Sequence, residues 1–359
     1  MTYVIAAAGT GGHVFPGLSV GEALVDLGAS RDDVVFVGGD RLEAKVYPDE
    51  GFSFLQVELR GLQRSLTPRN LALPKVVRKA RKKIHVAMVE LSVRVALGMG
   101  GYVTIPTAMA AKKAGIPFLH SEQNAKAGLA NRVAARWATR SFGSFPETGG
   151  LPGAEWVGNP VREPFWSFDS ESLKAEAQKR YGLRPDTPVL GVFGGSLGAG
   201  VINEAVSNLV ARWTEPAIQI VHLTGARNIE ALERLPHGPE VDWIRLGFEE
   251  SMETFYAACD LVVARAGGAV AELTATGTPS ILVPGEFGSG GHQSGNARFL
   301  SESGAAITLA ESDLAGLAEV VKNTMFAEDT LERMAASARR ISRPDAARTI
   351  ARAMMEQAS

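Results

Sequence analysis

The sequence predicts an α/β protein made of two doubly wound domains, each built on a parallel sheet. Short apolar runs of strand length alternate with helical patterns along the whole chain, which is typical of βαβ units. A glycine-rich turn between a strand and a helix occurs at 9–12 and again at 194–198, so the series restarts. The length of 359 residues fits two domains of about 150 residues each.

Eight apolar runs have the length and composition of buried strands, and a turn with Gly or Ser follows most of them. These runs are Tyr3–Ala6, Val34–Val37, Ala96–Met99, Pro117–Leu119, Val189–Phe193, Ile218–Val221, Leu261–Val263 and Ser280–Val283. A join falls near Pro160, because proline interrupts helices and central strands. We therefore expect one domain over 1–160 and a second over 161–341. The remaining helical stretch, 342–359, either caps the second domain or packs back on the first.

The composition is that of an ordinary globular protein, with 45% hydrophobic and 21% charged residues. It excludes a disordered tail protein, a collagenous chain and a small disulfide-stapled scaffold. The single cysteine, Cys259, cannot form an internal disulfide. No apolar stretch approaches the roughly 18 residues of a membrane span, and the N-terminus lacks the pattern of a secretory signal. We expect a cytosolic protein.

The net charge of −2 hides a difference between the two halves. Residues 1–158 contain 19 Lys and Arg against 13 Asp and Glu, which gives +6. The rest contains 18 against 26, which gives −8. Such an asymmetry indicates that the halves face different partners.

The two glycine turns are candidate anion sites. At the first turn, Gly9–Gly12, the backbone could approach a ligand, and helix amides follow directly. Val14 occupies the third glycine position of the dinucleotide fingerprint, which argues against a nicotinamide cofactor. A tight turn without any ligand fits the glycines alone equally well. The second turn, Gly194–Gly198, could hold a pyrophosphate with the Ser196 hydroxyl and with the amides of a helix that we expect to begin at 195–197.

Two familiar ways of binding phosphate are absent from the sequence. The chain contains no Asp-x-Asp pair to carry a divalent metal, so no cofactor is expected and helix amides would stabilise a departing diphosphate. The lysine of a P-loop is also missing, which argues against ATP hydrolysis.

Two polar residues near the later turns could contact a sugar nucleotide. Glu272 lies early in a helix, where a carboxylate can accept two hydrogen bonds from ribose hydroxyls. Complementing the helix dipole would account for the same residue. Gln293 lies within a glycine-rich stretch over 285–296 and offers a donor and an acceptor to sugar hydroxyls. A helix cap is the simpler role for that glutamine.

Taken together, the ordered motifs resemble the peptidoglycan N-acetylglucosaminyltransferases of glycosyltransferase family 28, which have the GT-B fold. The matching segments cover nearly the whole chain in the family's order. They are 9–18, 98–103, 122–125, 128–132, 158–162 and 194–196, followed by Glu272 and the pair His292-Gln293. Any one of these motifs is weak, whereas the ordered set is specific.

The resemblance implies two Rossmann-like domains facing a central cleft. It implies inverting transfer of GlcNAc from UDP-GlcNAc to the C4 hydroxyl of MurNAc in lipid I, which makes lipid II for peptidoglycan synthesis. The enzyme would work as a peripheral protein at the cytoplasmic face of the cell membrane, with a cell-wall and division complex as a further partner. The alternatives are an inactive UDP-sugar-binding scaffold, a sugar-nucleotide epimerase and a lipid galactosyltransferase.

The resemblance also implies roles for individual residues. The first domain and the join would contribute the donor contacts Thr10, Gly11, Gly12, Asn124 and Arg162, and Tyr102 at the acceptor cleft. The second domain would hold the diphosphate at Ser196, the ribose at Glu272, the GlcNAc hydroxyls at Gln293 and the uracil on the backbone near Glu249.

His13, at the start of the first helix, is the candidate general base for the acceptor hydroxyl. A helix N-terminus lowers the pKa of a histidine, which would keep the imidazole neutral. Alternatively, His13 only bonds donor phosphate or backbone. The sequence departs from the family pattern at Ser121, where a histidine is usual, at Gly268-Ala269, where the turn is one residue short, and at Glu249, where an apolar residue is usual.

A basic segment without acidic residues extends from Leu59 to Val89. Its apolar residues alternate with the cations Arg60, Arg64, Arg69, Lys75, Arg78, Lys79, Arg81, Lys82 and Lys83. Such a segment can bind the anionic inner-leaflet lipids around a lipid-linked acceptor. Alternatively, the segment is a solvated helix that touches nothing, or it binds nucleic acid nonspecifically. The charge of the first domain favours the membrane, so we expect no nucleic-acid partner.

Overall fold

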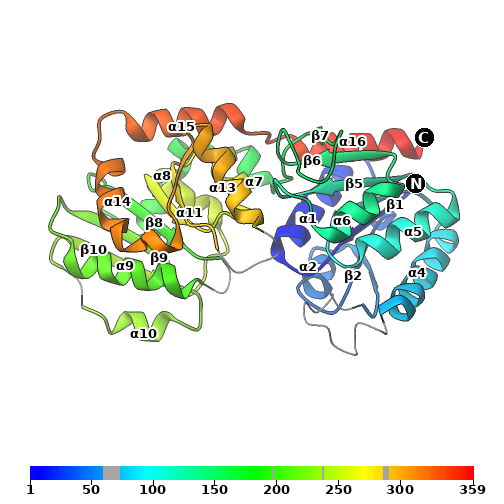
Figure 1. Cartoon of the computed structure of the whole chain (residues 1–359), viewed down its shortest axis with the longest axis horizontal. Helices are drawn as coiled ribbons and strands as arrows, with labels where there is room; N and C mark the ends of the chain where they lie inside the picture. Colours follow the sequence, from blue (N-terminus) through cyan, green and yellow to red (C-terminus); the bar gives the residue numbers. More distant parts are fainter. Residues whose placement is uncertain (60–72, 196–197, 237, 286–290) are drawn as a thin grey trace. The chain divides into compact units, whose positions relative to one another are not determined.

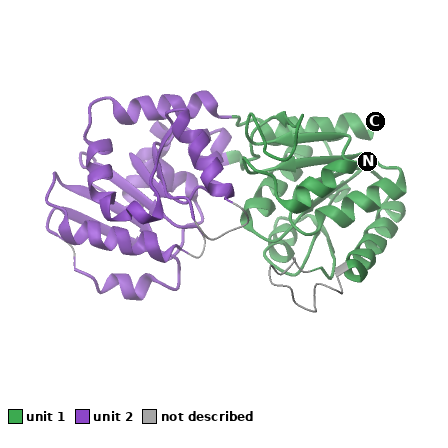
Figure 2. Ribbon diagram, viewed as in Figure 1, with its two compact units in different colours: residues 1–163, 343–359 green, residues 164–342 purple. Residues whose placement is uncertain are grey.

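The computed structural model describes residues 1–59, 73–195, 198–236, 238–285 and 291–359. The described chain divides into two compact units (Figure 2): residues 1–163 with 343–359, and residues 164–342. The boundary predicted after residue 160 lies close to the first crossing between them. The helix that covers the C-terminus belongs to the N-terminal unit.

The N-terminal unit, which contains both chain ends marked in Figure 1, is built on a parallel sheet. Among the described residues its strand order is β3-β2-β1-β4-β5-β6-β7. Its strands are β1 (Thr2–Ala7), β2 (Val34–Gly38), β3 (Ser53–Gln56), β4 (Val93–Gly100), β5 (Phe118–Glu122), β6 (Arg140–Gly143) and β7 (Glu155–Trp156). Its helices are α1 (Gly11–Asp26), α2 (Glu43–Asp49), α4 (Leu73–Glu90), α5 (Thr104–Ala114), α6 (Leu129–Ala134) and α16 (Ala346–Ala358), with short 3₁₀ turns at Arg31–Asp33 and Ala135–Trp137. A short helix, α7 (Glu163–Trp166), spans the first crossing to the other unit.

Alternate side chains of these strands pack on opposite faces of the sheet. Tyr3 and Ile5 of β1 belong to a core with α1, α2 and α16, whereas Val4 and Ala6 belong to a core with α4 and α5. Ile350 and Met354 of α16 are fully buried in the first of these cores. The C-terminal helix is therefore part of the N-terminal unit's hydrophobic core.

The C-terminal unit repeats the arrangement with strand order β10-β9-β8-β11-β12-β13, again with every described pairing parallel. Its strands are β8 (Val189–Phe193), β9 (Ile218–Leu223), β10 (Val241–Leu246), β11 (Leu261–Ala264), β12 (Ser280–Leu282) and β13 (Ala306–Thr308). Its helices are α8 (Ser170–Tyr181), α9 (Gly200–Arg212), α10 (Ile229–Glu233), α11 (Met252–Ala258), α12 (Ala269–Thr276), α13 (His292–Glu302), α14 (Leu317–Met325) and α15 (Thr330–Ile341), with a 3₁₀ helix at Glu311–Gly316.

These topologies confirm the predicted pair of doubly wound domains and show where ligands should bind. In such sheets the strand order reverses at one point, and ligands bind outside the carboxyl ends of the strands there. The reversal falls between β1 and β4 in the first unit and between β8 and β11 in the second. The turns after these four strands are therefore the places where a site is expected.

Candidate active site

The turn after β1 places the first candidate residues at the start of a helix, as predicted. Gly9 has a φ of +107°, a conformation that glycine adopts without strain. Thr10 is the N-cap residue of α1, which begins at Gly11. The Thr10 hydroxyl and His13 Nδ1 form a hydrogen bond of 3.2 Å. The cap and the candidate base are thus joined within one helical turn.

The His13 ring lies against the end of β4. A Cβ on Gly100, whose φ is +108°, would collide with Cδ2 of the His13 imidazole. The same Cβ would lie 3.3 Å from Nδ2 of Asn131, on α6. Gly100 is therefore required for two reasons, its backbone conformation and the space that the imidazole occupies.

Tyr102, predicted at the acceptor cleft, has its hydroxyl engaged inside the unit. The phenol donates a 2.8 Å hydrogen bond to Oε1 of Glu43, a carboxylate on α2 that is fully buried. Burial, and then this hydrogen bond, raise the pKa of Tyr102 well above its ordinary value. Glu43 is not among the site residues predicted from the sequence.

Asn124 is oriented by a buried carboxylate at the end of β5. Oε1 of Glu122, which is 1% exposed, accepts hydrogen bonds from the backbone N–H and from Nδ2 of Asn124. Oε2 of Glu122 accepts from the Gly128 N–H and from Nδ2 of Asn131. One acidic side chain thus holds Asn124 and links it to the residue beside His13.

Ser121, where the family pattern has a histidine, and the neighbouring His120 are both buried in β5. Ser121 and His120 each have no exposed surface, and burial lowers the pKa of the His120 imidazole. His120 therefore does not reach solvent as a replacement for the histidine that the family pattern has at position 121.

Arg162 belongs to the N-terminal unit and lies near the start of α1. Its guanidinium Cζ is 5.7 Å from the centroid of the Phe15 ring. The ring atoms of Phe15 would in turn lie 3.2 Å from a Cβ on Gly11. Phe15 is 39% exposed, so this corner of the unit presents an aromatic side chain and a cation together.

The turn after β8 differs from the prediction in one respect. Gly195 and Gly198 have φ values of +95° and +75°, and α9 begins only at Gly200. The predicted helix start at 195–197 is therefore wrong, because two left-handed residues delay the helix. Ser196 itself lies outside the described residues. The first helical amides after this turn are those that follow the N-cap residue Ala199.

A buried polar network supports this turn from β9. A Cβ on Gly198 would collide with the carbonyl oxygen of Thr224, which accepts from Nδ2 of Asn203 at 3.0 Å. Oδ1 of Asn203 then faces Nε2 of His222 at 3.0 Å, so this ring nitrogen carries the proton. Burial lowers the pKa of His222 to about 3.

Glu272 occupies the first turn of α12, as predicted, and its carboxylate is held in place. The Tyr256 hydroxyl donates a 2.8 Å hydrogen bond to Oε2 of Glu272. The Tyr256 ring is 2% exposed and makes edge contacts with Phe165, Phe193 and Phe255. Gly268 is the N-cap residue of α12, so the shortened turn still leads directly into the helix that carries Glu272.

The Glu249 side chain is committed to the interior of its unit. Its carboxylate accepts from Arg180 Nη2 at 2.6 Å, from the Tyr181 hydroxyl at 2.7 Å and from the Ser251 N–H at 2.9 Å. Burial and the bond to Glu249 raise the pKa of Tyr181 well above its ordinary value. Glu249, which stands where the family pattern has an apolar residue, thus connects the end of α8 to the start of α11.

Gln293 lies in the first turn of α13, and the oxygen of its side-chain amide already accepts a hydrogen bond. Its Oε1 accepts from the Gly285 N–H at 2.8 Å. Beside it, Arg265 donates to the Val283 carbonyl at 3.1 Å and forms an ion pair with Glu311. The residues 286–290 between Gly285 and the helix lie outside the described residues.

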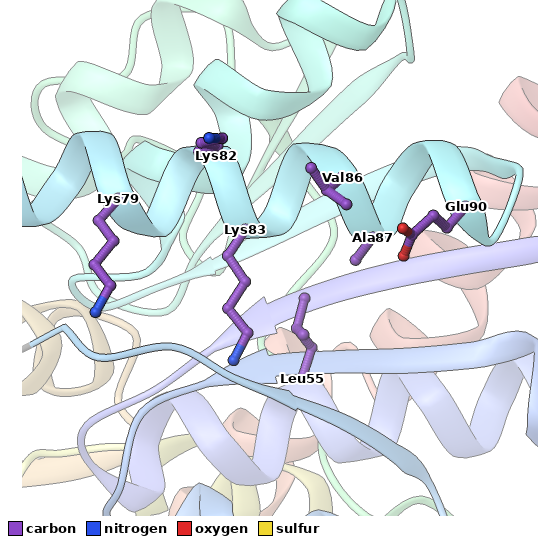
Figure 3. A pocket seen from close by; sticks show the side chains of 7 residues that line it. All are labelled: Leu55, Lys79, Lys82, Lys83, Val86, Ala87 and Glu90. Carbon is purple, nitrogen blue, oxygen red and sulfur yellow. The ribbon is translucent and has the colours of Figure 1, made fainter.

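Part of the predicted basic segment forms α4, and Arg60, Arg64 and Arg69 lie outside the described residues. Ala80, Ile84 and Met88 of α4 are buried in the core. A side of α4 next to these buried residues lines a pocket of about 380 Å³ together with Leu55 of β3 (Figure 3). The helical residues that line it are Lys79, Lys82, Lys83, Val86, Ala87 and Glu90. Lys79 forms an ion pair with Glu58, and Lys83 donates to the Gln56 carbonyl at 2.8 Å.

Two properties of the described residues bear on the membrane and on metals. None of the described helices is both long enough and apolar enough to cross a membrane. Within the same residues, no group of three or more His, Cys, Asp or Glu side chains is placed to hold a metal ion.

Comparison with known proteins gives the same family for both units. Residues 3–142 match the glycosyltransferase family 28 N-terminal domain, and residues 189–350 match the family's C-terminal domain. Relatives from Salinibacter ruber and Aromatoleum aromaticum are each 39% identical to this chain. The first match covers 97% of this chain and 95% of the relative, and the second covers 100% and 98%. The chain belongs to glycosyltransferase family 28.

Both of these family 28 relatives are named UDP-N-acetylglucosamine--N-acetylmuramyl-(pentapeptide) pyrophosphoryl-undecaprenol N-acetylglucosamine transferase. The crystal structure of MurG from Acinetobacter baumannii has a TM-score of 0.82 and 28% identity, over 99% of this chain and all of that one. A UDP-GlcNAc 2-epimerase from Neisseria meningitidis, at 14% identity and a TM-score of 0.68 over 99% of this chain and all of the epimerase, shares the fold alone.

In this family 28 chain the predicted site residues divide between the two units. The N-terminal unit holds Thr10, Gly11, Gly12, His13, Tyr102, Asn124 and Arg162. The C-terminal unit holds Glu249, Glu272 and Gln293. Sequence reasoning missed the residues that orient them, Glu43, Glu122 and Tyr256. Glu122 lies inside one of the matching motifs, so the sequence could have indicated its role. Glu43 and Tyr256 are far along the chain from the residues that they orient, and only the fold brings them together.

The buried His222 makes the stability of the C-terminal unit depend on pH. A folded-state pKa of about 3 against an ordinary value of 6.5 means that only the unfolded chain binds a proton between these pH values. Stability therefore falls as the pH is lowered through this window, by about 1.4 kcal/mol per pH unit at most. Between pH 6.5 and pH 5, we expect a loss of about 2 kcal/mol.

The measurement is the free energy of unfolding from hydrogen exchange of the β9 and β10 amides at several pH values. His222→Gln keeps a donor toward Asn203 and cannot titrate, so its pH slope should be smaller by about one proton. Equal slopes for the two proteins would contradict the assignment of this effect to His222.

Proposed function

We propose that this chain transfers GlcNAc from UDP-GlcNAc to the C4 hydroxyl of MurNAc in lipid I, with inversion at C1, and so makes lipid II. The observation that carries the proposal is 39% identity, over essentially the full length of both chains, to relatives named for this activity. Both family domains are present, each with its glycine turn and its polar residues at the carboxyl ends of the central strands.

The C-terminal unit would bind the donor. The Glu272 carboxylate, oriented by Tyr256, would accept hydrogen bonds from the ribose hydroxyls. Gln293 would act as a donor to an oxygen of GlcNAc, because its own oxygen already accepts from Gly285. Since the Glu249 carboxylate is used internally, a uracil contact there would come from the main chain.

The reaction is a direct displacement with His13 as the proposed base. The C4 oxygen attacks C1 of GlcNAc, the bond from C1 to the UDP oxygen breaks, and the acceptor proton passes to the imidazole. UDP departs with the electron pair of the broken bond, which stays on its terminal diphosphate oxygen. Thr10, Gly11, Gly12 and Arg162 would lie beside the donor.

We propose further that the departing diphosphate is stabilised without a metal ion. The chain has no Asp-x-Asp pair, and the turns at 9–12 and 194–198 each lead into a helix whose first amides can face an anion. Preorganised amides can supply the electrostatic stabilisation that a divalent cation gives elsewhere.

The test is transfer of labelled GlcNAc from UDP-GlcNAc to a lipid I analogue, with and without EDTA. We expect lipid II with inverted configuration, at a rate that the chelator changes by less than about twofold. Loss of activity with EDTA that Mg²⁺ restores would contradict the metal-free proposal. Binding of UDP-GlcNAc without any transfer would identify the chain as a scaffold and overturn the proposed function.

Substitution of His13 tests its role as the base. We expect His13→Ala to lower kcat on the order of 10²–10⁴-fold, because general-base catalysis contributes this much. The KM for UDP-GlcNAc should change little if His13 acts on the acceptor. Steady-state kinetics with both substrates varied gives the answer. A loss below tenfold would leave His13 as a phosphate or backbone contact only.

We also propose that the chain acts at the cytoplasmic face of the cell membrane, with α4 toward anionic lipids. The exposed side of α4 carries Lys75, Arg78, Lys82 and Lys83 together with Val86 and Val89, which are 42% and 61% exposed. In Figure 3, Lys79 and Lys83 extend from α4 toward the strand that carries Leu55. Cations beside exposed apolar side chains fit an anionic lipid surface. A cell-wall and division complex is the further partner that we propose there.

Vesicle binding tests this surface with a matched control. Lys82→Gln/Lys83→Gln should weaken binding to phosphatidylglycerol vesicles on the order of tenfold, since each basic group contributes about 1 kcal/mol near such a surface. Lys112→Gln/Lys113→Gln removes the same charge from exposed positions at the end of α5 and should have a smaller effect. Binding that ignores the anionic lipid content would contradict the proposal.

A further inference from the structure

We propose that Glu43 is a positioning residue that holds the turn carrying His13 in its reactive place. The inference rests on the proposed function, because it assigns Glu43 a role in that reaction. Glu43 is the first residue of α2, and its side chain has no exposed surface. It is neither in the predicted site nor placed to touch a substrate.

The carboxylate of Glu43 gathers donors from three different turns. Oε2 accepts from the Gly9 N–H at 3.2 Å. Oε1 accepts from the Gly39 N–H at 3.0 Å and from the Tyr102 hydroxyl at 2.8 Å. Among the described residues, no ion pair involves Glu43, so these three donors are the hydrogen bonds that compensate a buried charge.

These donors come from the carboxyl ends of three adjacent strands. Gly39 follows β2, Gly9 follows β1 and Tyr102 follows β4, and these strands lie side by side in the order β2-β1-β4. The turns pack closely, because a Cβ on Gly39 would collide with the Tyr102 hydroxyl and one on Gly101 with the carbonyl of Ala8. One side chain therefore fastens both turns that border the point where the strand order reverses.

The two turns that Glu43 connects, after β1 and after β4, lie on either side of His13. Gly9 directly precedes Thr10, which caps α1 and is hydrogen-bonded to the imidazole. On the other side, Tyr102 is two residues from Gly100, against which the imidazole packs. A shift of either turn would move the imidazole, and misplacement by about 1 Å can cost a reaction on the order of 10²-fold.

Only a carboxylate satisfies this set of donors. Three hydrogens converge on it, and Glu43 offers two acceptor oxygens without a hydrogen of its own. The isosteric glutamine has one acceptor oxygen, and its NH₂ group would point a hydrogen at a backbone N–H. Because a backbone N–H faces each carboxylate oxygen, Glu43→Gln breaks the connection to Gly9 or to Gly39, without removing volume.

The experiment compares Glu43→Gln with the wild-type chain in the transfer assay. We expect kcat to fall on the order of 10–100-fold, with the KM for UDP-GlcNAc within about threefold, because the C-terminal unit binds the donor. Tyr102→Phe removes one of the three donors and should give a smaller loss. Amide hydrogen exchange, which does not depend on activity, should be faster at Gly9 or at Gly39 in Glu43→Gln.

A matched control separates positioning from lower stability. Met88→Ala opens a cavity in the α4 core and should lower the Tm while kcat stays near wild type. A wild-type kcat for Glu43→Gln in an active background would overturn the role of Glu43. Unchanged exchange at Gly9 and Gly39 would overturn the connection itself. A wild-type chain without transfer activity would instead overturn the proposed function, and the exchange data would still report on the connection.

Discussion

Parallel pairing of the strands is the constraint on which both units depend. Every described strand pair is parallel, so within each sheet all the carboxyl ends lie at one edge. Apart from Arg162, each predicted site residue that the structure describes lies in a turn, or in the first turn of a helix, that follows a strand at such an edge. The sheets therefore bring together residues that are separated by tens of positions along the chain, and the glycines at this edge let the backbone come close.

Buried carboxylates do much of the ordering at these edges. Glu43, Glu122 and Glu249 each have less than 7% exposed surface, and each accepts at least three hydrogen bonds from backbone N–H groups and side chains. A loop cannot supply the ladder hydrogen bonds of a sheet, so an acidic side chain that gathers its amides fixes its shape instead. A buried polar network whose groups are hydrogen-bonded in this way makes the turns around it rigid.

The centre of each sheet could be predicted from the sequence, whereas its outer strands could not. All eight predicted runs are strands, because a central parallel strand is buried on both faces and is apolar throughout. The strands that were missed are β3, β6, β7, β10 and β13, which lie at or next to sheet edges and include exposed or half-buried positions. At the site, glycine turns and helix starts were visible in the sequence, but the helix after β8 begins later than predicted because Gly198 is left-handed. The partners Glu43 and Tyr256 could not be found, since nothing local links them to Gly9 or Glu272.

The return of the last helix to the first unit has a consequence for how the chain matures. The C-terminal unit is, in topological terms, an insertion between residue 163 and α16. A ribosome therefore releases all of the inserted unit before it releases the residues that complete the first core, Ile350 and Met354 among them. Domains otherwise fold in order of synthesis, but here the first core is completed only after the residues of α16 have followed the whole inserted unit out of the ribosome.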